Sequence, residues 1–190
     1  MFNIEQCENI KPKWRKIVKN YTPLTAQNKD CLANQIIEQY KQLITFTTDK
    51  QKAYYSPSLD RIALPPYQNF KNENNYYATA MHEMAHSTGH TSRLNRLATN
   101  AKKAAFGSQE YSKEELVAET ASAMLLNLAG INPEDTIENS AAYIQSWANK
   151  IKTDKKLSLI SAMNQAEKAV NWILTATGYS DLLPAYELAQ

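Results

Sequence analysis

The sequence predicts an α+β fold in which a β-hairpin or small sheet packs against a mostly helical domain. Short runs rich in aromatic and β-branched residues, separated by turn residues, lie before residue 66 of the chain. From Tyr76 onward, capping residues and glycines divide the chain into segments of helical length. Strands in one part of a chain and helices in another are typical of α+β domains.

The chain is long enough for one domain with its own core. It has 190 residues, of which 43% are hydrophobic and 21% are charged, a composition that argues against general disorder. Residues 1–24 lack a periodic pattern and contain Pro12 and Pro23, so we expect an irregular N-terminal segment there. We therefore assign residues 25–190 to a single domain.

The first predicted elements are one helix and one hairpin. A helix is expected over residues 25–43, with Thr25 as its N-cap, because apolar residues recur there at helical spacing. Residues 53–55 and 61–64 are two short β-rich runs joined by turn residues, which predicts a hairpin. The Pro-Pro pair that ends the second run favours an edge position for it, since proline cannot donate a ladder hydrogen bond.

Four further helices are predicted, each with a capping residue at its start or a glycine at its end. Gly89 ends the first of these helices and is expected in the left-handed conformation of a C-cap. Ser112 is expected to open the second helix, which Gly130 closes, and Gly178 is expected to end the last. The expected ranges are 75–88, 112–129, 132–153 and 154–178.

Charge and cysteine content exclude several classes of protein. The formal net charge is +2, so contact with DNA is compatible with the charge but not indicated by it. Cys7 and Cys31 are too few for a disulfide framework. The chain has no run of about 18 apolar residues that could cross a membrane, and its N-terminus has no signal-peptide pattern. We expect a cytoplasmic protein with no membrane association.

His82, Glu83 and His86 form the sequence His-Glu-Met-Ala-His on the helix expected over residues 75–88. Residues four apart lie on one helix face, about 6 Å apart along the axis, so both imidazoles can reach one ion. Zinc binds neutral imidazole at about 2.0–2.1 Å and keeps a position for water when the protein supplies three ligands. A carboxylate beside the first ligand can take a proton from that water. The pattern is therefore typical of a zinc-dependent hydrolase.

A third protein ligand is required, and the candidates are His90, Glu115 and Glu119. On an unbroken helix His90 would lie about 12 Å along the axis from His82, too far to share an ion, although a turn at Gly89 could redirect it. We favour for His90 a supporting position behind the ligands or a hydrogen bond within its loop. Glu115 and Glu119 share a helix face, so one can bind metal while the other accepts a hydrogen bond from a ligand imidazole.

Glu115 is the favoured ligand and Glu119 the favoured hydrogen-bond partner. One alternative stays open, because Ser112 and Glu115 also fit the capping box of a helix N-terminus. In that case Glu115 would be a local capping residue and Glu119 would bind the metal.

The histidine motif followed by a second helix with two acidic residues four apart resembles the gluzincin branch of zinc metallopeptidases. The chain resembles more closely the metallopeptidase domain of ArdC-type antirestriction and polyvalent proteins, which occur on plasmids, phages and other mobile elements. The matching residues span nearly the whole chain: 2–6, 60–62, 64–66, 76–79, 82–90, 92–94, 106–108, Tyr111, 114–119, 142–144 and Trp147.

The resemblance implies a zincin-like fold with Glu115 as the third ligand of one divalent ion and Glu119 orienting a ligand histidine. ArdC-type proteins also carry an N-terminal domain that binds single-stranded DNA. The matched residues do not include such a domain, and we expect this chain to lack it.

The predicted activity is metal-assisted hydrolysis of a peptide bond in a protein or peptide substrate. Glu83 would act as general base and then pass the proton to the leaving amine. Tyr111 and Tyr143 are candidate donors to the developing oxyanion, with ordinary packing as the alternative for each. An edge strand can pair with an extended peptide, so the second β-rich run supplies the candidate substrate contacts: Arg61, Ile62, Ala63 and Leu64.

Zinc is the favoured ion, although two imidazoles and a carboxylate also accept cobalt, manganese or nickel. Two other functions remain open. One is a non-proteolytic protein that protects DNA or blocks a restriction enzyme, with a structural metal. The other is an interaction module within a larger phage or plasmid protein.

Overall fold

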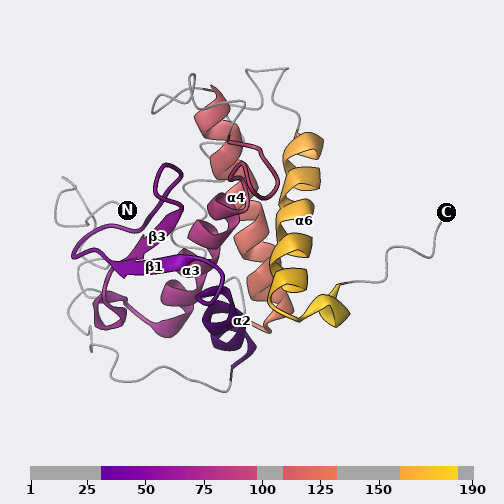
Figure 1. The fold of residues 1–190 in the computed structure, drawn as a ribbon. Helices are drawn as coiled ribbons and strands as arrows, with labels where there is room; N and C mark the ends of the chain where they lie inside the picture. The colour runs from indigo at the N-terminus through magenta and orange to yellow at the C-terminus, as the bar shows by residue number, and fades with distance from the viewer. Residues whose placement is uncertain (1–30, 98–108, 132–158, 184–190) are drawn as a thin grey trace, which may run out of the picture.

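The computed structural model describes residues 31–97, 109–131 and 159–183. Over these residues the chain forms four α-helices and one three-stranded sheet (Figure 1), which confirms the predicted α+β class. Two short 3₁₀ helices, η2 and η4, complete the described elements. The bounds are α2 Leu32–Tyr40, β1 Thr45–Thr48, β2 Tyr54–Ser56, β3 Arg61–Leu64, η2 Tyr67–Asn69, α3 Glu73–Ser87, α4 Gln109–Leu128, α6 Leu159–Ala176 and η4 Ser180–Leu182.

The sheet has the strand order β1-β3-β2. β2 and β3 pair antiparallel, with Tyr55 opposite Ile62, as the predicted hairpin requires. β1 pairs parallel with the other side of β3, with Phe46 opposite Ile62. The predicted edge position of residues 61–64 is therefore wrong, because β3 is the central strand. Its prolines do not prevent this, since they follow the last paired residue and interrupt no ladder hydrogen bond.

α2 is shorter than predicted at both ends. It begins at Leu32 rather than near Thr25, and its N-cap is Cys31, whose Sγ accepts a hydrogen bond from the Asn34 amide at 3.4 Å. It ends at Tyr40, three residues before the predicted Leu43. The buried side chains of the helix face the core, whereas Leu43 is 49% exposed in the turn that follows. Packing therefore ends this helix earlier than apolar spacing indicates.

α3 carries the histidine motif in a well-capped helix. The Asn72 side chain accepts a hydrogen bond from the Asn75 amide at 2.8 Å, which fixes the N-terminus. The helix ends at Ser87, but Gly89 does not have the left-handed conformation predicted for it. Gly89 is instead required by close packing, because a Cβ atom there would lie 2.8 Å from Leu97 Cγ.

The ends of the last two described helices agree with the predictions. Gly130 follows α4 with φ of 72°, and Gly178 follows α6 with φ of 83°. α4 begins at Gln109, however, so Ser112 lies inside the helix and cannot cap it. The capping-box alternative for Glu115 is therefore removed. The N-terminal segment 1–24 and the helix expected over 132–153 lie outside the described residues.

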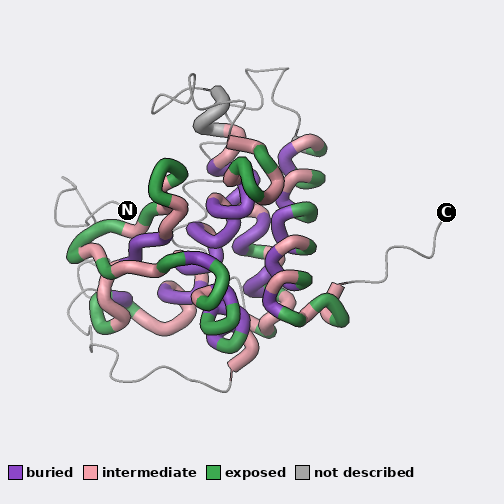
Figure 2. Tube along the Cα trace, viewed as in Figure 1, coloured by how far each residue is buried: buried purple, intermediate pink, exposed green. Residues whose placement is uncertain are grey.

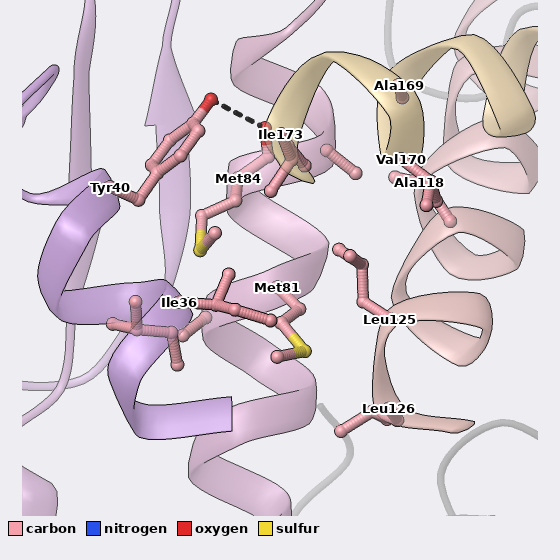
Figure 3. Close-up of a cluster of buried hydrophobic side chains, with 14 of the residues drawn as sticks. Ile36, Tyr40, Met81, Met84, Ala118, Leu125, Leu126, Ala169, Val170 and Ile173 are labelled. Carbon is pink, nitrogen blue, oxygen red and sulfur yellow. Dashed lines mark hydrogen bonds between the residues drawn. The ribbon is translucent and has the colours of Figure 1, made fainter. Parts of the chain in front are cut away.

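The core lies where the helices meet around α3. α3 packs against α2, β2, β3, α4 and α6, and the helix faces turned toward one another are buried while the outer side of α6 is exposed (Figure 2). Apolar side chains from all four helices converge there (Figure 3). Those labelled are Ile36, Tyr40, Met81, Met84, Ala118, Leu125, Leu126, Ala169, Val170 and Ile173. This packing fixes α3 against α4 at the level of the histidine motif. None of the helices described here is long and apolar enough to span a membrane.

Candidate metal centre

Two adjacent helices bring together His82, His86 and Glu115. α3 supplies both imidazoles from successive turns of one face, and α4 supplies the carboxylate. One ligand atom from each of the three residues lies within 4.8 Å of the others. The ring nitrogens His82 Nε2 and His86 Nε2 are 3.0 Å apart. Glu115 places Oε2 3.7 Å from the first nitrogen and Oε1 3.5 Å from the second.

These spacings fit a single small metal ion. Two ligands about 2.05 Å from a tetrahedrally coordinated ion are about 3.3 Å apart, and the three separations given above lie on both sides of that value. The donor set of two imidazole nitrogens and one carboxylate oxygen leaves a fourth tetrahedral position for a water molecule or a substrate oxygen. The described residues therefore fit a site for one divalent metal ion.

Two further carboxylates lie next to the Nδ1 atoms of the two imidazoles, on the side of each ring away from the ligand nitrogen Nε2. Glu119 Oε1 lies 3.5 Å from His82 Nδ1, the position predicted for it from its spacing to Glu115. Glu114 Oε1 lies 3.3 Å from His86 Nδ1. Metal-binding histidines commonly direct the second ring nitrogen at a carboxylate, which fixes the ring orientation.

Sequence reasoning did not identify the position of Glu114. The helical repeat places Glu115 and Glu119 on one face of the helix. Glu114 is the preceding residue, so its side chain points in a different direction around the helix axis. Only the angle between α3 and α4 brings His86 to the side of α4 where Glu114 lies. The one signal in the sequence is the run of two adjacent glutamates.

Glu83 lies beside the ligand cluster on α3 and is only 7% exposed. Burial raises the pKa of its carboxyl to about 7, although the nearby His86 lowers it and Glu115 raises it further. The backbone N–H of Tyr55 in β2 donates a hydrogen bond to this carboxylate. A carboxyl group with a pKa near neutrality can both accept and release a proton at physiological pH.

The electrostatic surroundings of the two imidazoles differ. Burial lowers the pKa of His82 to about 3, and the charge of His86 adds to this effect. Burial also acts to lower the pKa of His86, but hydrogen bonds to Glu114 and Glu115 outweigh it and raise the pKa to about 10. Burial and the charge of Glu115 raise the pKa of Glu119 to about 7.

His90 lies outside the ligand cluster. Its Nδ1 is 2.7 Å from Ser92 Oγ and 3.8 Å from Asp60 Oδ2. The turn that begins at Gly89 directs it toward the β2–β3 hairpin rather than toward the other histidines. Of the two roles favoured for His90, the hydrogen bond within its loop agrees with these contacts.

A buried arginine joins the same hairpin to the end of α3. The Arg93 guanidinium donates to both carboxylate oxygens of Asp60, to the Tyr55 hydroxyl at 3.1 Å and to the Ser87 carbonyl at 2.7 Å. The hairpin is thereby held against α3 at the level of Glu83.

The remaining predicted site residues fall into two groups. Tyr111 lies in α4, but its side chain, like all of Tyr143, is outside the described part of the structure. The predicted substrate strand is β3, in which Ile62, Ala63 and Leu64 are buried and Arg61 is partly buried. Both edges of β3 are already paired, so it cannot add a peptide strand, and that prediction is wrong.

Comparison with known proteins places these features in a family. A family model described as zincin-like metallopeptidase (MPTase-PolyVal) matches residues 32–165. DNA primase TraC of Escherichia coli is 34% identical over 174 residues, covering 92% of this chain and 11% of that protein. The uncharacterized protein y4eC of Sinorhizobium fredii is 31% identical over 122 residues, covering 64% of this chain and 38% of that protein.

The solved structures similar to this one include two of the antirestriction ArdC protein from plasmid R388. The Mn(II)-bound structure has a TM-score of 0.62 and 31% identity, covering 82% of this chain and 54% of that chain. The metal-free structure has a TM-score of 0.62 and 30% identity, covering 93% of this chain and 59% of that chain.

The chain therefore spans about a tenth of the TraC protein and less than two thirds of ArdC. The matches confirm the predicted zincin-like fold and the resemblance to ArdC-type proteins. Because the family model covers more than half of the sequence, the chain belongs to the zincin-like metallopeptidase family.

Proposed function

We propose that this domain binds one divalent metal ion through His82, His86 and Glu115 and hydrolyses a peptide bond. The observation that carries the proposal is the juxtaposition of the three donor atoms, all within 4.8 Å of one another, with the buried carboxyl group of Glu83. A structural metal site needs four protein ligands, whereas the described residues contribute three to this cluster and place a proton acceptor next to it.

When bound, a divalent ion supplies Lewis acidity, which polarises the scissile carbonyl and lowers the pKa of a water molecule. Glu83 accepts a proton from the attacking water, and a C–O bond forms at the carbonyl carbon. Glu83 then donates that proton to the departing amine as the C–N bond breaks. Burial raises the pKa of Glu83, whereas a bound cation would lower it and favour the charged form that accepts the proton.

The substrate chain is proposed to lie along β2 rather than β3. β2 is an edge strand of the described sheet, and the Tyr55 amide on it is directed at the Glu83 carboxylate. The unpaired side of β2 therefore faces the proposed reaction centre. An extended peptide that lies along this edge would have its backbone next to Glu83, and its carbonyl would compete with the Glu83 carboxylate for the Tyr55 amide.

Zinc and manganese are both candidate ions. Two imidazoles and a carboxylate accept either one, and the related ArdC protein has a Mn(II)-bound structure. Metal analysis of the purified protein by mass spectrometry, followed by titration of the stripped protein with each ion, would distinguish them. We expect one ion per chain.

The decisive test is the variant Glu83→Gln. It keeps the side-chain volume and should retain metal content, but hydrolysis of a peptide library should fall by at least about 100-fold, the lower range for loss of a general base. Glu38→Gln on α2 is the control, since Glu38 is an exposed member of an ion pair with Lys41. Equal cleavage by wild type and Glu83→Gln would contradict the proposal.

A second candidate function is protection of DNA against restriction without proteolysis. It is favoured by one observation, the similarity to a protein named for antirestriction. The two functions are distinguished by measuring how strongly unmodified DNA is restricted in cells that carry wild type, Glu83→Gln or His86→Ala. If Glu83→Gln protects as well as wild type while His86→Ala does not, the metal has a structural role and the peptidase proposal fails.

A further inference from the structure

The loop that follows α3 turns back and places Arg96 between α3 and α4. Leu97 N donates to Gly89 O at 2.9 Å and closes the loop on itself. The Arg96 guanidinium then reaches the end of α3, where Nη1 donates to Thr88 Oγ1 at 2.7 Å and Nη2 donates to Ala85 O at 2.9 Å. A cation in this position also interacts favourably with the C-terminal end of the α3 dipole.

The same guanidinium makes a two-point contact with a carboxylate of α4. Arg96 Nε donates to Glu114 Oε2 at 3.1 Å, and Nη2 donates to Oε1 at 2.8 Å. The two side chains are only 7% and 12% exposed. Two parallel hydrogen bonds fix the plane of a carboxylate as well as its position, which a single contact does not.

The fixed carboxylate of Glu114 also contacts His86, one of the candidate metal ligands. The oxygen that accepts from Arg96 Nη2 is the one that lies 3.3 Å from His86 Nδ1. An ionised carboxylate can only accept hydrogen bonds, so His86 must donate from Nδ1. His86 binds a metal ion only as a neutral ring, and in that form its other nitrogen, Nε2, keeps its lone pair on the side of the ring that faces His82 and Glu115.

Gly89 lies directly beside the Arg96 guanidinium. A Cβ atom at residue 89 would lie 3.2 Å from Arg96 Nη2 and 3.1 Å from the His86 carbonyl oxygen. The absence of a side chain at Gly89 is therefore part of what allows the guanidinium to approach α3.

We propose that Arg96 is a positioning residue of the metal centre, which holds Glu114 as the acceptor for His86 Nδ1 and thereby presents His86 Nε2 to the ion. This inference rests on the proposed function, because it assigns to Arg96 a part in metal binding. Arg96 touches neither substrate nor metal in this role. Its contribution is to the affinity for a divalent cation.

The test compares Arg96→Met with Arg93→Met in the full chain. Both arginines lie in the loop after α3, both pair with a carboxylate, and their side chains are 7% and 8% exposed. Zn²⁺ and Mn²⁺ affinities are measured by competition with a chromophoric chelator, and unfolding by urea is recorded for each metal-free protein. Arg96→Met should weaken metal binding by about 10- to 100-fold, while Arg93→Met should leave it within about twofold despite its loss of stability.

Glu114→Gln supplies a second measurement that does not depend on the folding of Arg96→Met. It should also weaken metal binding by about 10-fold or more. The double variant Arg96→Met/Glu114→Gln should bind metal about as weakly as Glu114→Gln alone, because Arg96 acts through this carboxylate. Unchanged affinity in Glu114→Gln, independent effects in the double variant, or equal losses in the two arginine variants would overturn the inference.

Failure of the proposed function has a different signature. Wild-type protein that binds neither Zn²⁺ nor Mn²⁺ contradicts the metal centre itself. Wild-type protein that binds either ion, with Arg96→Met binding it equally well, contradicts only the role of Arg96.

Discussion

Asp60 and Arg93 form the contact that holds the β2–β3 hairpin to the end of α3. Hydrogen bonds from the Arg93 guanidinium lower the pKa of the Asp60 carboxyl, and the Tyr55 hydroxyl adds to this effect against the opposing influence of burial. The contact therefore favours the charged carboxylate in the folded state.

The sign of the resulting pH dependence follows from the lowered pKa. The stabilisation is fully present above the unfolded pKa of about 3.9 and is lost as the pH falls through the lower folded value. Because Asp60 is 35% exposed, solvent screening limits the effect to about 1 kcal/mol or less. The free energy of unfolding of wild type should fall more steeply than that of Asp60→Asn between about pH 5 and pH 3. Parallel profiles in urea titrations would refute this assignment.

Gly89 is a position where packing rather than backbone conformation requires glycine. Gly89→Ala should reduce the free energy of unfolding by about 1–3 kcal/mol, the usual cost of overpacking, because its Cβ would lie 2.8 Å from Leu97 Cγ. Gly130→Ala is a useful comparison. Beyond its chain neighbours, no atom of the described residues lies within 4 Å of that Cβ, so the expected cost of about 1–2 kcal/mol comes from the positive φ. Urea unfolding measures both, and a Gly89→Ala protein as stable as wild type would be inconsistent with the packing.

At the scale of elements, α6 stabilises the domain through one face only. Ile173 is fully buried in the core, whereas Ile160 on the same helix is 72% exposed. Ile173→Ala should reduce the free energy of unfolding by about 2–5 kcal/mol, since it removes buried methyl groups and leaves a cavity. Ile160→Ala should change it by about 0.5 kcal/mol or less. Similar losses in the two variants, measured by urea unfolding, would contradict the orientation of α6.

The sheet shows where element prediction succeeds and where it fails. The β2–β3 hairpin is local, and its turn residues and aromatic runs were sufficient to predict it. β1 was missed because Thr45–Thr48 is short and mostly polar, and because its parallel pairing with β3 joins residues 16 positions apart. A prediction that lacks β1 leaves Arg61–Leu64 at an edge of the sheet. The two prolines after Leu64 correctly predict where that strand ends, but they do not indicate which strands pair with it.

At the scale of the whole molecule, the candidate metal ligands come from two helices separated by a long connection. Binding of an ion should therefore stabilise the packing of α3 on α4 and raise the free energy of unfolding. At a free metal concentration 100 times the dissociation constant, the increase is about 2.7 kcal/mol. His82→Ala should abolish this increase, while His90→Ala should retain it, since His90 contacts Ser92 and Asp60 instead. Thermal unfolding with and without added Zn²⁺ or Mn²⁺ measures the difference. Loss of the effect in His90→Ala would contradict the ligand set.

Local sequence patterns are sufficient to predict the α+β class, the helix that carries His82, Glu83 and His86, and the spacing that relates Glu115 to Glu119. These features are local, because helical periodicity and turn chemistry act over a few residues. Three features emerge only from the packing of the folded chain: the central position of β3, the placement of His90 away from the ligands, and the contact of Glu114 with His86 and Arg96. Each depends on how separate elements pack against one another, and the angle between α3 and α4 has no signature in the spacing of residues along either helix.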